Sequence, residues 1–406
     1  MTTSPPSRLH LTTTRLPLVC RPHLHYPSLT ARIDEVAACA AKSARDDLPA
    51  PDRINAACAT WNLSALIAAD CGLPDYAEDL CLRQLRLFLR QAWPLTGDTV
   101  IAALQPLVNL VRLTARTGQK TAAFDELTAL HHAVDHGGTV TVHGHTVDLT
   151  GFTDEATRRH IRPWLRFLML DDGTRLLAST GQWAKAAAHA AAYDDTPDRL
   201  TEARQTQTVA ALTADDPDRA AYLIDSAALV DPGDTAVADV LRYLVRDTTG
   251  SNTPAHYPAL TTTVETVFTK APAHTRMFRT RLALTVIELA PPGDTGQARL
   301  HDAVIHDALA AQDFYAAREI LRRSSAEPGP AHRAQLEAVV RRAGLGSGRL
   351  PEDAAHAIEE ATRLAGNGLA HCLTPAHPRS RYAPAAPKTA IAPRSSHRSP
   401  PQVPSA

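Results

Sequence analysis

The residues best suited to bind a metal are five histidines in one short stretch: His131, His132, His136, His143 and His145. His132 and His136 are four residues apart, so one helix face could present both, and strand alternation would place His143 and His145 on one face. Neutral imidazoles arranged in this way can ligate zinc. However, histidines at the end of a helix also interact favourably with its dipole, and no HExxH or CxxC pattern accompanies them. We therefore expect no metal and no other cofactor.

A second candidate site is a polar stripe on a helix expected over residues 99–117. Gln105, Asn109, Arg112 and Arg116 follow one another at i, i+4, i+7 and i+11, which places them on one helix face. Amide and guanidinium groups in a row can bind the backbone of an extended peptide, and arginine can bind a carboxylate through two hydrogen bonds. An ordinary solvated face would have the same pattern, so both interpretations stay open.

Motifs for catalysis or nucleotide binding are absent from the sequence. It has no GxGxxG, no phosphate-binding P-loop and no GxSxG nucleophile motif. A basic run at residues 158–162 follows two acidic residues, Asp154 and Glu155, which favours a solvated helix face over a contact with nucleic acid. We expect a protein that is not an enzyme and that does not bind nucleic acid directly.

Three similar turns indicate which elements would position the polar residues. In each turn an alanine-rich helical segment ends at a glycine, and an alanine follows five residues later. The three pairs are Gly72 with Ala77, Gly118 with Ala123, and Gly181 with Ala186. Glycine ends a helix because it readily takes the left-handed backbone conformation, and the small alanine allows the next helix to pack closely. The pattern predicts antiparallel helix pairs.

The spacing of these pairs resembles that of tetratricopeptide-like α-solenoids. Ala186 and Ala220 are 34 residues apart, which is the tetratricopeptide period. Pro232 follows Ala220 by twelve residues, where such repeats commonly end their second helix, and Trp61 precedes Gly72 by eleven, as the tryptophan of the repeat would.

A later match is the segment 314–317, which has Gln312 in the position of the glycine. The other intervals between successive alanines are 46, 63 and 97 residues, so the chain departs from a regular period. The resemblance covers roughly residues 52–325. It implies that the first helix of every pair lines one concave surface, on which the polar residues of successive first helices converge. The candidate binding residues are then Asn62, Gln105, Asn109, Arg112, Arg116, Asp172 and Arg175.

The expected organisation is an all-α solenoid with one inserted β-hairpin. Residues 139–148 alternate in polarity around Gly144, which predicts the hairpin. The helical-repeat domain spans residues 29–366. Residues 1–28 are expected to be loosely ordered or draped over the first helices, and residues 367–406, rich in proline and basic residues, are expected to be disordered because they offer no core.

Several helix boundaries follow from capping patterns. Asp98 is expected as an N-cap, and Thr196-Pro197 and Asp216-Pro217 are each expected to begin a helix. Residues 154–180 are expected to form one helix.

The composition narrows the class of protein. The net charge is −1 and the isoelectric point is near 7.0, so no global field attracts nucleic acid or anionic lipid. No run approaches the roughly 18 apolar residues that would span a bilayer, and the six cysteines form no CxxC pair. We expect a cytoplasmic protein with reduced thiols and no membrane association.

These observations favour a scaffold or regulatory module that binds a protein or peptide partner in a concave polar groove. One alternative is an enzyme or biosynthetic accessory protein that binds a small acidic ligand in the helical curve, through Asn109, Arg112 and Arg175. Another is a transcription regulator whose DNA-binding domain belongs to a partner. Ligand and partner identity, pathway and oligomeric state stay open.

Overall fold

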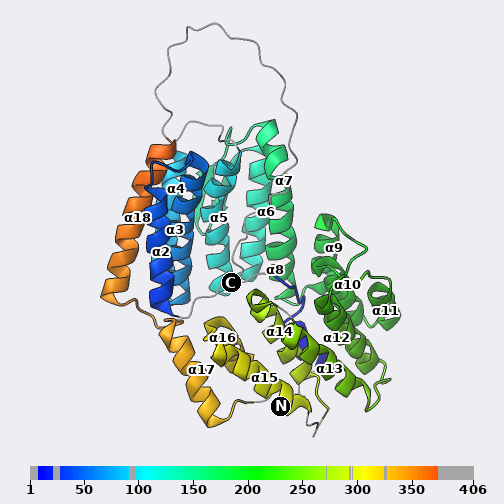
Figure 1. Cartoon of the computed structure of the whole chain (residues 1–406). Coiled ribbons are helices and arrows are strands. Elements are labelled where there is room, and N and C mark those ends of the chain that lie inside the picture. The colour runs from blue at the N-terminus through cyan, green and yellow to red at the C-terminus, as the bar shows by residue number, and fades with distance from the viewer. Residues whose placement is uncertain are drawn as a thin grey trace, which may run out of the picture.

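The computed structural model describes residues 8–21, 28–90, 95, 97–270, 272–291, 294, 296–323 and 327–373. This part of the chain is helical apart from one two-stranded antiparallel sheet (Figure 1). Most helices pack against the next one in the sequence, which gives an array of antiparallel helix pairs. None of the described helices is long and apolar enough to cross a membrane. The predicted fold class is confirmed.

The first half of the array surrounds one hydrophobic core. Its elements are α2 (Leu29–Ser43), α3 (Ala50–Asp70), α4 (Pro74–Leu89), α5 (Asp98–Arg116), α6 (Lys120–His136), β1 (Thr139–Val142), β2 (His145–Asp148) and α7 (Glu155–Leu168). The last helix of the described chain, α18 (Glu352–Leu373), returns to this half and packs against α2 and α3.

The second half surrounds a separate core. It begins with a π-helical turn, η1 (Met169–Gly173), and a 3-10 turn, η2 (Ala273–Thr275), precedes α14. Its helices are α8 (Thr174–Ala178), α9 (Trp183–Tyr193), α10 (Glu202–Thr213), α11 (Pro217–Asp225), α12 (Pro232–Thr248), α13 (His256–Lys270), α14 (Arg276–Glu288), α15 (Gly296–Ala310), α16 (Phe314–Arg323) and α17 (Pro330–Arg342).

The predicted glycine turns are confirmed. Gly72, Gly118 and Gly181 have φ values of 84°, 90° and 75°, and Gln312 takes the same left-handed conformation with φ 55°. Asp215 is a further member of this set, with φ 59°. The alanines five residues after these turns are fully buried against the preceding helix: Ala77, Ala123, Ala186, Ala220 and Ala317. The pattern therefore marks helix pairs, although their spacing along the chain is irregular.

The hairpin was also predicted correctly. Thr139 pairs with Asp148 and Val142 with His145. The inward-facing Val140, Val142 and Val147 are buried in the first core, and the hairpin packs against α5 and α6.

Three expected helix boundaries were wrong. Pro232 does not end a helix; it begins α12, where Asp231 caps the end by accepting a hydrogen bond from the Asp234 amide at 2.9 Å. Proline suits the first helical turn because the amide it lacks has no partner there in any case. Asp98 lies inside α5 and makes no side-chain cap.

The third wrong boundary is at Thr196-Pro197, which forms a turn. The Asp194 carboxylate accepts from the Thr196 amide at 3.1 Å, and α10 starts only at Glu202, capped by Thr201. The prediction at Asp216-Pro217 is confirmed, since the Asp216 carboxylate accepts from the Arg219 amide at 3.0 Å.

The last helix runs past the predicted end of the repeat domain at residue 366. Helix α18 continues through Gly366 and Gly368 to Leu373. A Cβ at Gly368 would lie 2.8 Å from the Ser43 carbonyl oxygen, so this glycine allows close packing on α2 and does not end the helix. The rest of the predicted tail, residues 374–406, lies outside the described residues.

The N-terminal segment, residues 8–21, packs against the second half of the array and not over the first helices. It begins with α1 (Arg8–Thr13), which contacts α14. Leu16 and Leu18 are 5 % and 2 % exposed and belong to the second core. The expectation of a loosely ordered start thus does not hold for this segment. The remainder of the range 1–28 lies largely outside the described residues.

Candidate functional site

The polar residues of the first helices meet one another as the chain passes from pair to pair. Helices α3 and α5 flank α4 and contact each other. The Asn109 amide on α5 donates to the Asn62 side-chain oxygen on α3 at 3.1 Å, and Gln105 donates to Asn109 at 3.2 Å. These three amides form a chain of hydrogen bonds along the helices.

Two arginines continue this row. Arg112 donates to the Asp172 carboxylate at 2.8 and 3.4 Å, and Arg116 forms an ion pair with Asp70 at 3.1 Å. The side chains of Arg112 and Arg116 are 24 % and 32 % exposed, so part of each guanidinium reaches the surface. Arg175 donates to Asp171 at 2.5 Å.

The structure thus brings all seven predicted residues into one row, which we call the polar seam. It comprises Asn62, Gln105, Asn109, Arg112, Arg116, Asp172 and Arg175, together with Asp70. Their role in binding stays a prediction.

Asp70 connects the two halves of the molecule. Its carboxylate is fully buried and also pairs with Arg32 on α2 at 2.8 Å. The Tyr315 hydroxyl, on α16 in the second half, donates to the same carboxylate. Sequence reasoning missed Asp70 because it is the last residue of its helix and its partners come from three distant parts of the chain.

The seam ends at the π-helical turn η1, which interrupts the helix predicted over residues 154–180. The His189 ring lies beside this turn, with Nε2 2.8 Å from the Met169 carbonyl oxygen. A Cβ at Gly173 would lie 2.4 Å from the same ring nitrogen. A glycine is therefore needed for the histidine to reach the turn, and the turn places Asp171 and Asp172 side by side.

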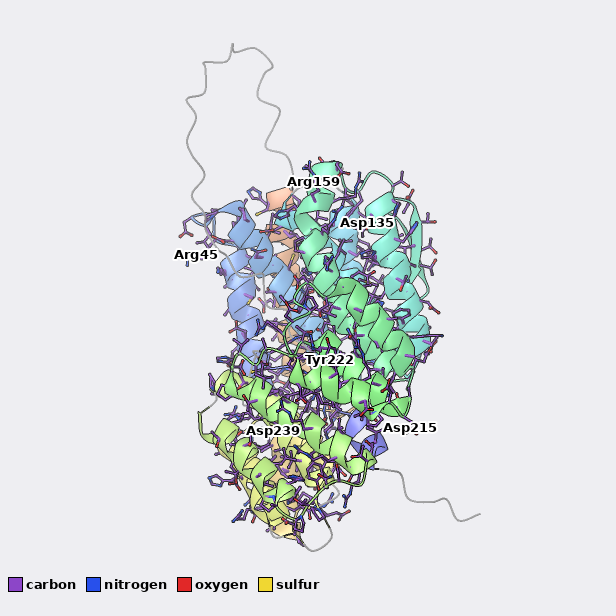
Figure 2. All side chains as sticks on the ribbon, turned by 90° about the vertical axis from the view of Figure 1, so that its right-hand side faces the viewer. Arg45, Asp135, Arg159, Asp215, Tyr222 and Asp239 are labelled. Atoms are coloured by element: carbon purple, nitrogen blue, oxygen red, sulfur yellow. The ribbon has the colours of Figure 1, made fainter. Side chains whose placement is uncertain are left out.

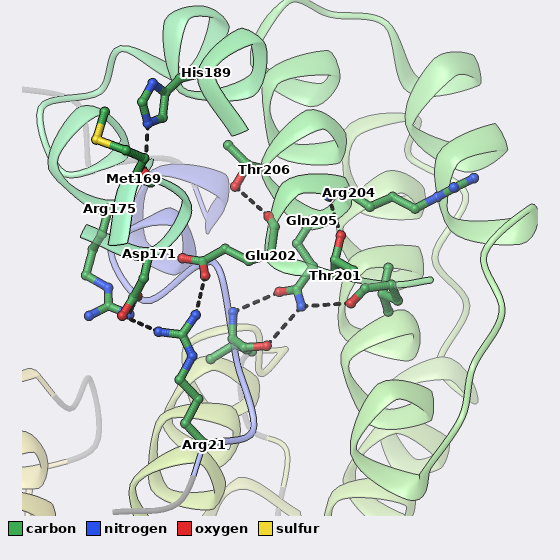
Figure 3. A network of polar contacts seen from close by, with 12 residues as sticks. Arg21, Met169, Asp171, Arg175, His189, Thr201, Glu202, Arg204, Gln205 and Thr206 are labelled. Atoms are coloured by element: carbon green, nitrogen blue, oxygen red, sulfur yellow. Dashed lines mark hydrogen bonds and ion pairs between the residues drawn. The ribbon is translucent and has the colours of Figure 1, made fainter. Parts of the chain in front are cut away.

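Asp171 belongs to a buried charge cluster that Figure 3 shows from close by. Arg21, from the N-terminal segment, reaches between Asp171 and Glu202; its Nη2 is 2.6 Å from Glu202 Oε2, and it also pairs with Asp171. The side chains of Asp171 and Glu202 are only 5 % and 3 % exposed. We call Arg21, Asp171, Arg175 and Glu202 the buried cluster.

The two carboxyls of the buried cluster have pKa values shifted in opposite directions. Burial, with the Asp171 charge, raises the pKa of Glu202 to about 8 despite Arg21 and Arg175. Burial also acts to raise the pKa of Asp171, but Arg175 and Arg21 outweigh it, so the pKa lies below its ordinary value. The Oε1 atom of Glu202 is buried and has no hydrogen-bond partner among the described residues. A protonated carboxyl next to an ionised one is the arrangement we infer near neutral pH.

One turn further along α10, Gln205 binds the backbone of the N-terminal segment. Its Oε1 accepts from the Leu18 amide at 2.8 Å, and its Nε2 donates to the Leu18 carbonyl oxygen at 2.9 Å. The Gln205 residue is 3 % exposed. A single side-chain amide therefore satisfies both backbone groups of an extended residue.

Sequence reasoning missed Arg21, Glu202 and Gln205. Residues 181 and 187 positions apart in the sequence form these contacts, and no local periodicity connects them. The only local signal is the alternation of arginine and leucine at residues 15, 16, 18 and 21.

The predicted histidines form two separate pairs. The His132 and His136 rings stack with centroids 4.3 Å apart. His143 and His145 approach one carboxylate, that of Glu78, at 3.6 and 2.5 Å. Among the described residues no group of three or more histidines, cysteines or carboxylates is arranged to hold a metal ion.

Comparisons with models of known protein families, with curated proteins and with solved structures gave no match. The site must therefore be interpreted from its own geometry.

Proposed function

We propose that this chain is a divergent tetratricopeptide-like scaffold or regulatory module that binds an extended segment of a protein partner along the first helices of its pairs. The observation that carries the proposal is the bidentate contact between Gln205 and the Leu18 backbone. It supports the capacity of this row of helices to hold an extended chain, since side-chain amides facing a backbone are a recurrent means of peptide recognition.

The polar seam would supply the corresponding contacts in the first half of the row. Its amides, Asn62 and Asn109, are partly exposed and hydrogen-bonded to each other. Each amide keeps further donors and acceptors, which a peptide backbone could engage without loss of the existing bond. Arg112 and Arg116 stand next to these amides with part of each guanidinium open to solvent.

The alternative, a small acidic ligand in the helical curve, is less well supported. Every arginine of the seam already pairs with a carboxylate of the chain: Arg112 with Asp172, Arg116 with Asp70, and Arg175 with Asp171. A ligand carboxylate would have to displace an acidic side chain that remains nearby and repels it. A peptide backbone is neutral and has no such cost.

Panning a display library of short random peptides against the full chain tests the proposal. Peptides enriched on the unmodified chain should bind Arg112→Ala and Asn109→Ala more weakly. For Arg112→Ala the expected loss is about ten- to hundred-fold, the equivalent of one hydrogen bond to a charged group. Circular dichroism should show both variants folded.

The matched control is Arg159→Ala. Arg159 on α7 is 67 % exposed and pairs with Glu155 of its own helix, and it lies near one end of the molecule (Figure 2). Enriched peptides should bind this variant unchanged. Equal binding to all variants, or no enrichment on the unmodified chain, would contradict a binding role for the polar seam.

A further inference from the structure

The N-terminal segment crosses several helices of the second half in the way expected of a peptide ligand. In Figure 1 its dark blue trace passes between α8 and α14. Its contacts fall on four helices of this half and on η1. Along the segment they are Arg8 with Asp247 on α12, Arg15 with Glu288 on α14 and Glu319 on α16, Leu18 with Gln205 on α10, and Arg21 with Glu202 on α10 and Asp171 on η1.

The surface beneath the segment is complementary to it in charge. The three arginines of the segment meet five carboxylates, and the side chains of Arg15 and Glu288 are 2 % and 7 % exposed. Between the arginines, Leu16 and Leu18 enter the second core. The surface therefore recognises a basic and apolar chain, with the spacing Arg-Leu-x-Leu-x-x-Arg.

Recognition of the segment also uses its backbone, which any extended peptide could offer. Gln205 engages only the amide and carbonyl of Leu18. The nearby Glu202 Oε1 is buried and lacks a hydrogen-bond partner among the described residues, so one polar atom beneath the segment stays unsatisfied.

We propose that the N-terminal segment is a tethered ligand that occupies the second half of the binding surface. The partner is then a protein that presents an extended basic and apolar peptide. In this peptide two leucines are two residues apart, and an arginine follows the second leucine by three residues. The partner peptide displaces the segment by offering the same contacts in trans. This inference rests on the proposed function, because it assigns the partner of the same row of helices. It adds a regulatory step, since release of the segment must precede binding.

The decisive experiment weakens the contacts of the segment with its own chain and measures the binding of a separate peptide. The probe is a fluorescent synthetic peptide of residues 8–21, added to the full chain. Arg21→Ala in the chain removes the charge that fills the buried cluster but leaves Asp171, Glu202 and Gln205 in place to receive the arginine of the peptide. Because the apparent affinity is reduced by the fraction of chains whose site is open, this variant should bind the peptide about tenfold more tightly than the unmodified chain.

Two controls make the result specific. Cys20→Ala in the chain alters an exposed residue of the same segment and should leave the affinity of the peptide unchanged. A peptide carrying Leu18→Ala should bind every chain at least about tenfold more weakly, because it loses a side chain that is buried in the second core.

If the segment is only a structural part of the fold, weakening its contacts should not allow the peptide to bind. Arg21→Ala would then show no saturable binding of the peptide, which would overturn the inference. Concentration-dependent dimers of Arg21→Ala would also overturn it, because the occupant would then be a second copy of this chain.

A second variant keeps the test informative if Arg21→Ala does not fold. A specific protease site inserted within residues 22–27 allows the segment to be cut from the folded full chain. Exchange of the cut segment for the labelled peptide supports the inference. A cut segment that never exchanges, or a chain that unfolds on cleavage, overturns it. Neither result affects the display experiment on the polar seam, so the two proposals can fail separately.

Discussion

Two stretches of the same row of helices carry their charges at different depths. In the first half none of the described segments lies over the polar seam as the N-terminal segment does in the second, and the arginines Arg112 and Arg116 are 24 % and 32 % exposed. In the second half the N-terminal segment covers the row, and the side chains of Arg15 and Glu202 are 2 % and 3 % exposed. The residue types are the same in both stretches; what differs is whether a chain lies over them.

This difference in exposure determines how much each stretch contributes to the stability of the fold. Half-exposed ion pairs are screened by water and stabilise a protein by about 0–1 kcal/mol each. Buried pairs have lost their hydration, so removing one partner leaves an uncompensated charge and costs about 3–5 kcal/mol. The pair between Arg112 and Asp172 can therefore be lost with little effect on stability, whereas the buried Asp70 of the same stretch cannot. In the covered stretch the residues of the binding surface also stabilise the fold.

The largest expected effect compares Asp171 with Asp172, which are adjacent in the π-helical turn. Asp171→Ala leaves Arg21 and Arg175 without their buried carboxylate, so the free energy of unfolding should fall by about 3–5 kcal/mol. Asp172→Ala breaks the partly exposed pair with Arg112 and should cost about 1 kcal/mol. Urea denaturation of both variants measures the difference. Similar losses for the two would mean that the two stretches are not distinct.

A second prediction uses the raised pKa of Glu202. In the unfolded chain this carboxyl has its ordinary pKa, near 4.5, whereas burial raises it to about 8 in the folded protein. Between these values the folded state holds a proton that the unfolded state has lost, so stability falls as the pH rises from about 4.5 to 8. Each unit of the shift corresponds to about 1.4 kcal/mol.

Glu202→Gln removes this titration while keeping the shape of the side chain. The difference in unfolding free energy between variant and unmodified chain should grow in favour of the variant across that pH range and level off above it. Thermal unfolding at a series of pH values measures this difference, and other groups cancel because both chains contain them. A constant difference from pH 4.5 to 8 would show that Glu202 is ionised throughout.

The helix pairs could be predicted from the sequence because their signals are local. A glycine that takes a left-handed conformation and an alanine five residues later both act within a single turn, so Gly72, Gly118 and Gly181 mark their turns wherever the pairs fall in the chain. The polar stripe of the seam could also be predicted, since its residues on α5 have helical spacing and parallel first helices bring successive stripes together.

The covered stretch could not be predicted in this way. The contact between Leu18 and Gln205 joins residues 187 positions apart, and nothing near either residue indicates the other. The π-helical turn was missed for a related reason. Its geometry depends on His189, which approaches Gly173 from another helix, whereas the local sequence is compatible with a continuous helix.

The smallest expected effect tests this account of the π-helical turn. Gly173 has helical backbone angles (φ −62°), so on propensity alone Gly173→Ala should stabilise the helix by about 0.5–1 kcal/mol. The added Cβ would lie 2.4 Å from the His189 ring nitrogen, however, and must displace the ring from the Met169 carbonyl. Loss of that hydrogen bond costs about 1 kcal/mol, which offsets the gain or reverses it. In a His189→Ala background the obstacle is gone, and the same substitution should then be clearly stabilising. A double-mutant cycle measured by thermal unfolding gives the coupling between the two sites; no coupling would mean that the histidine does not hold the turn.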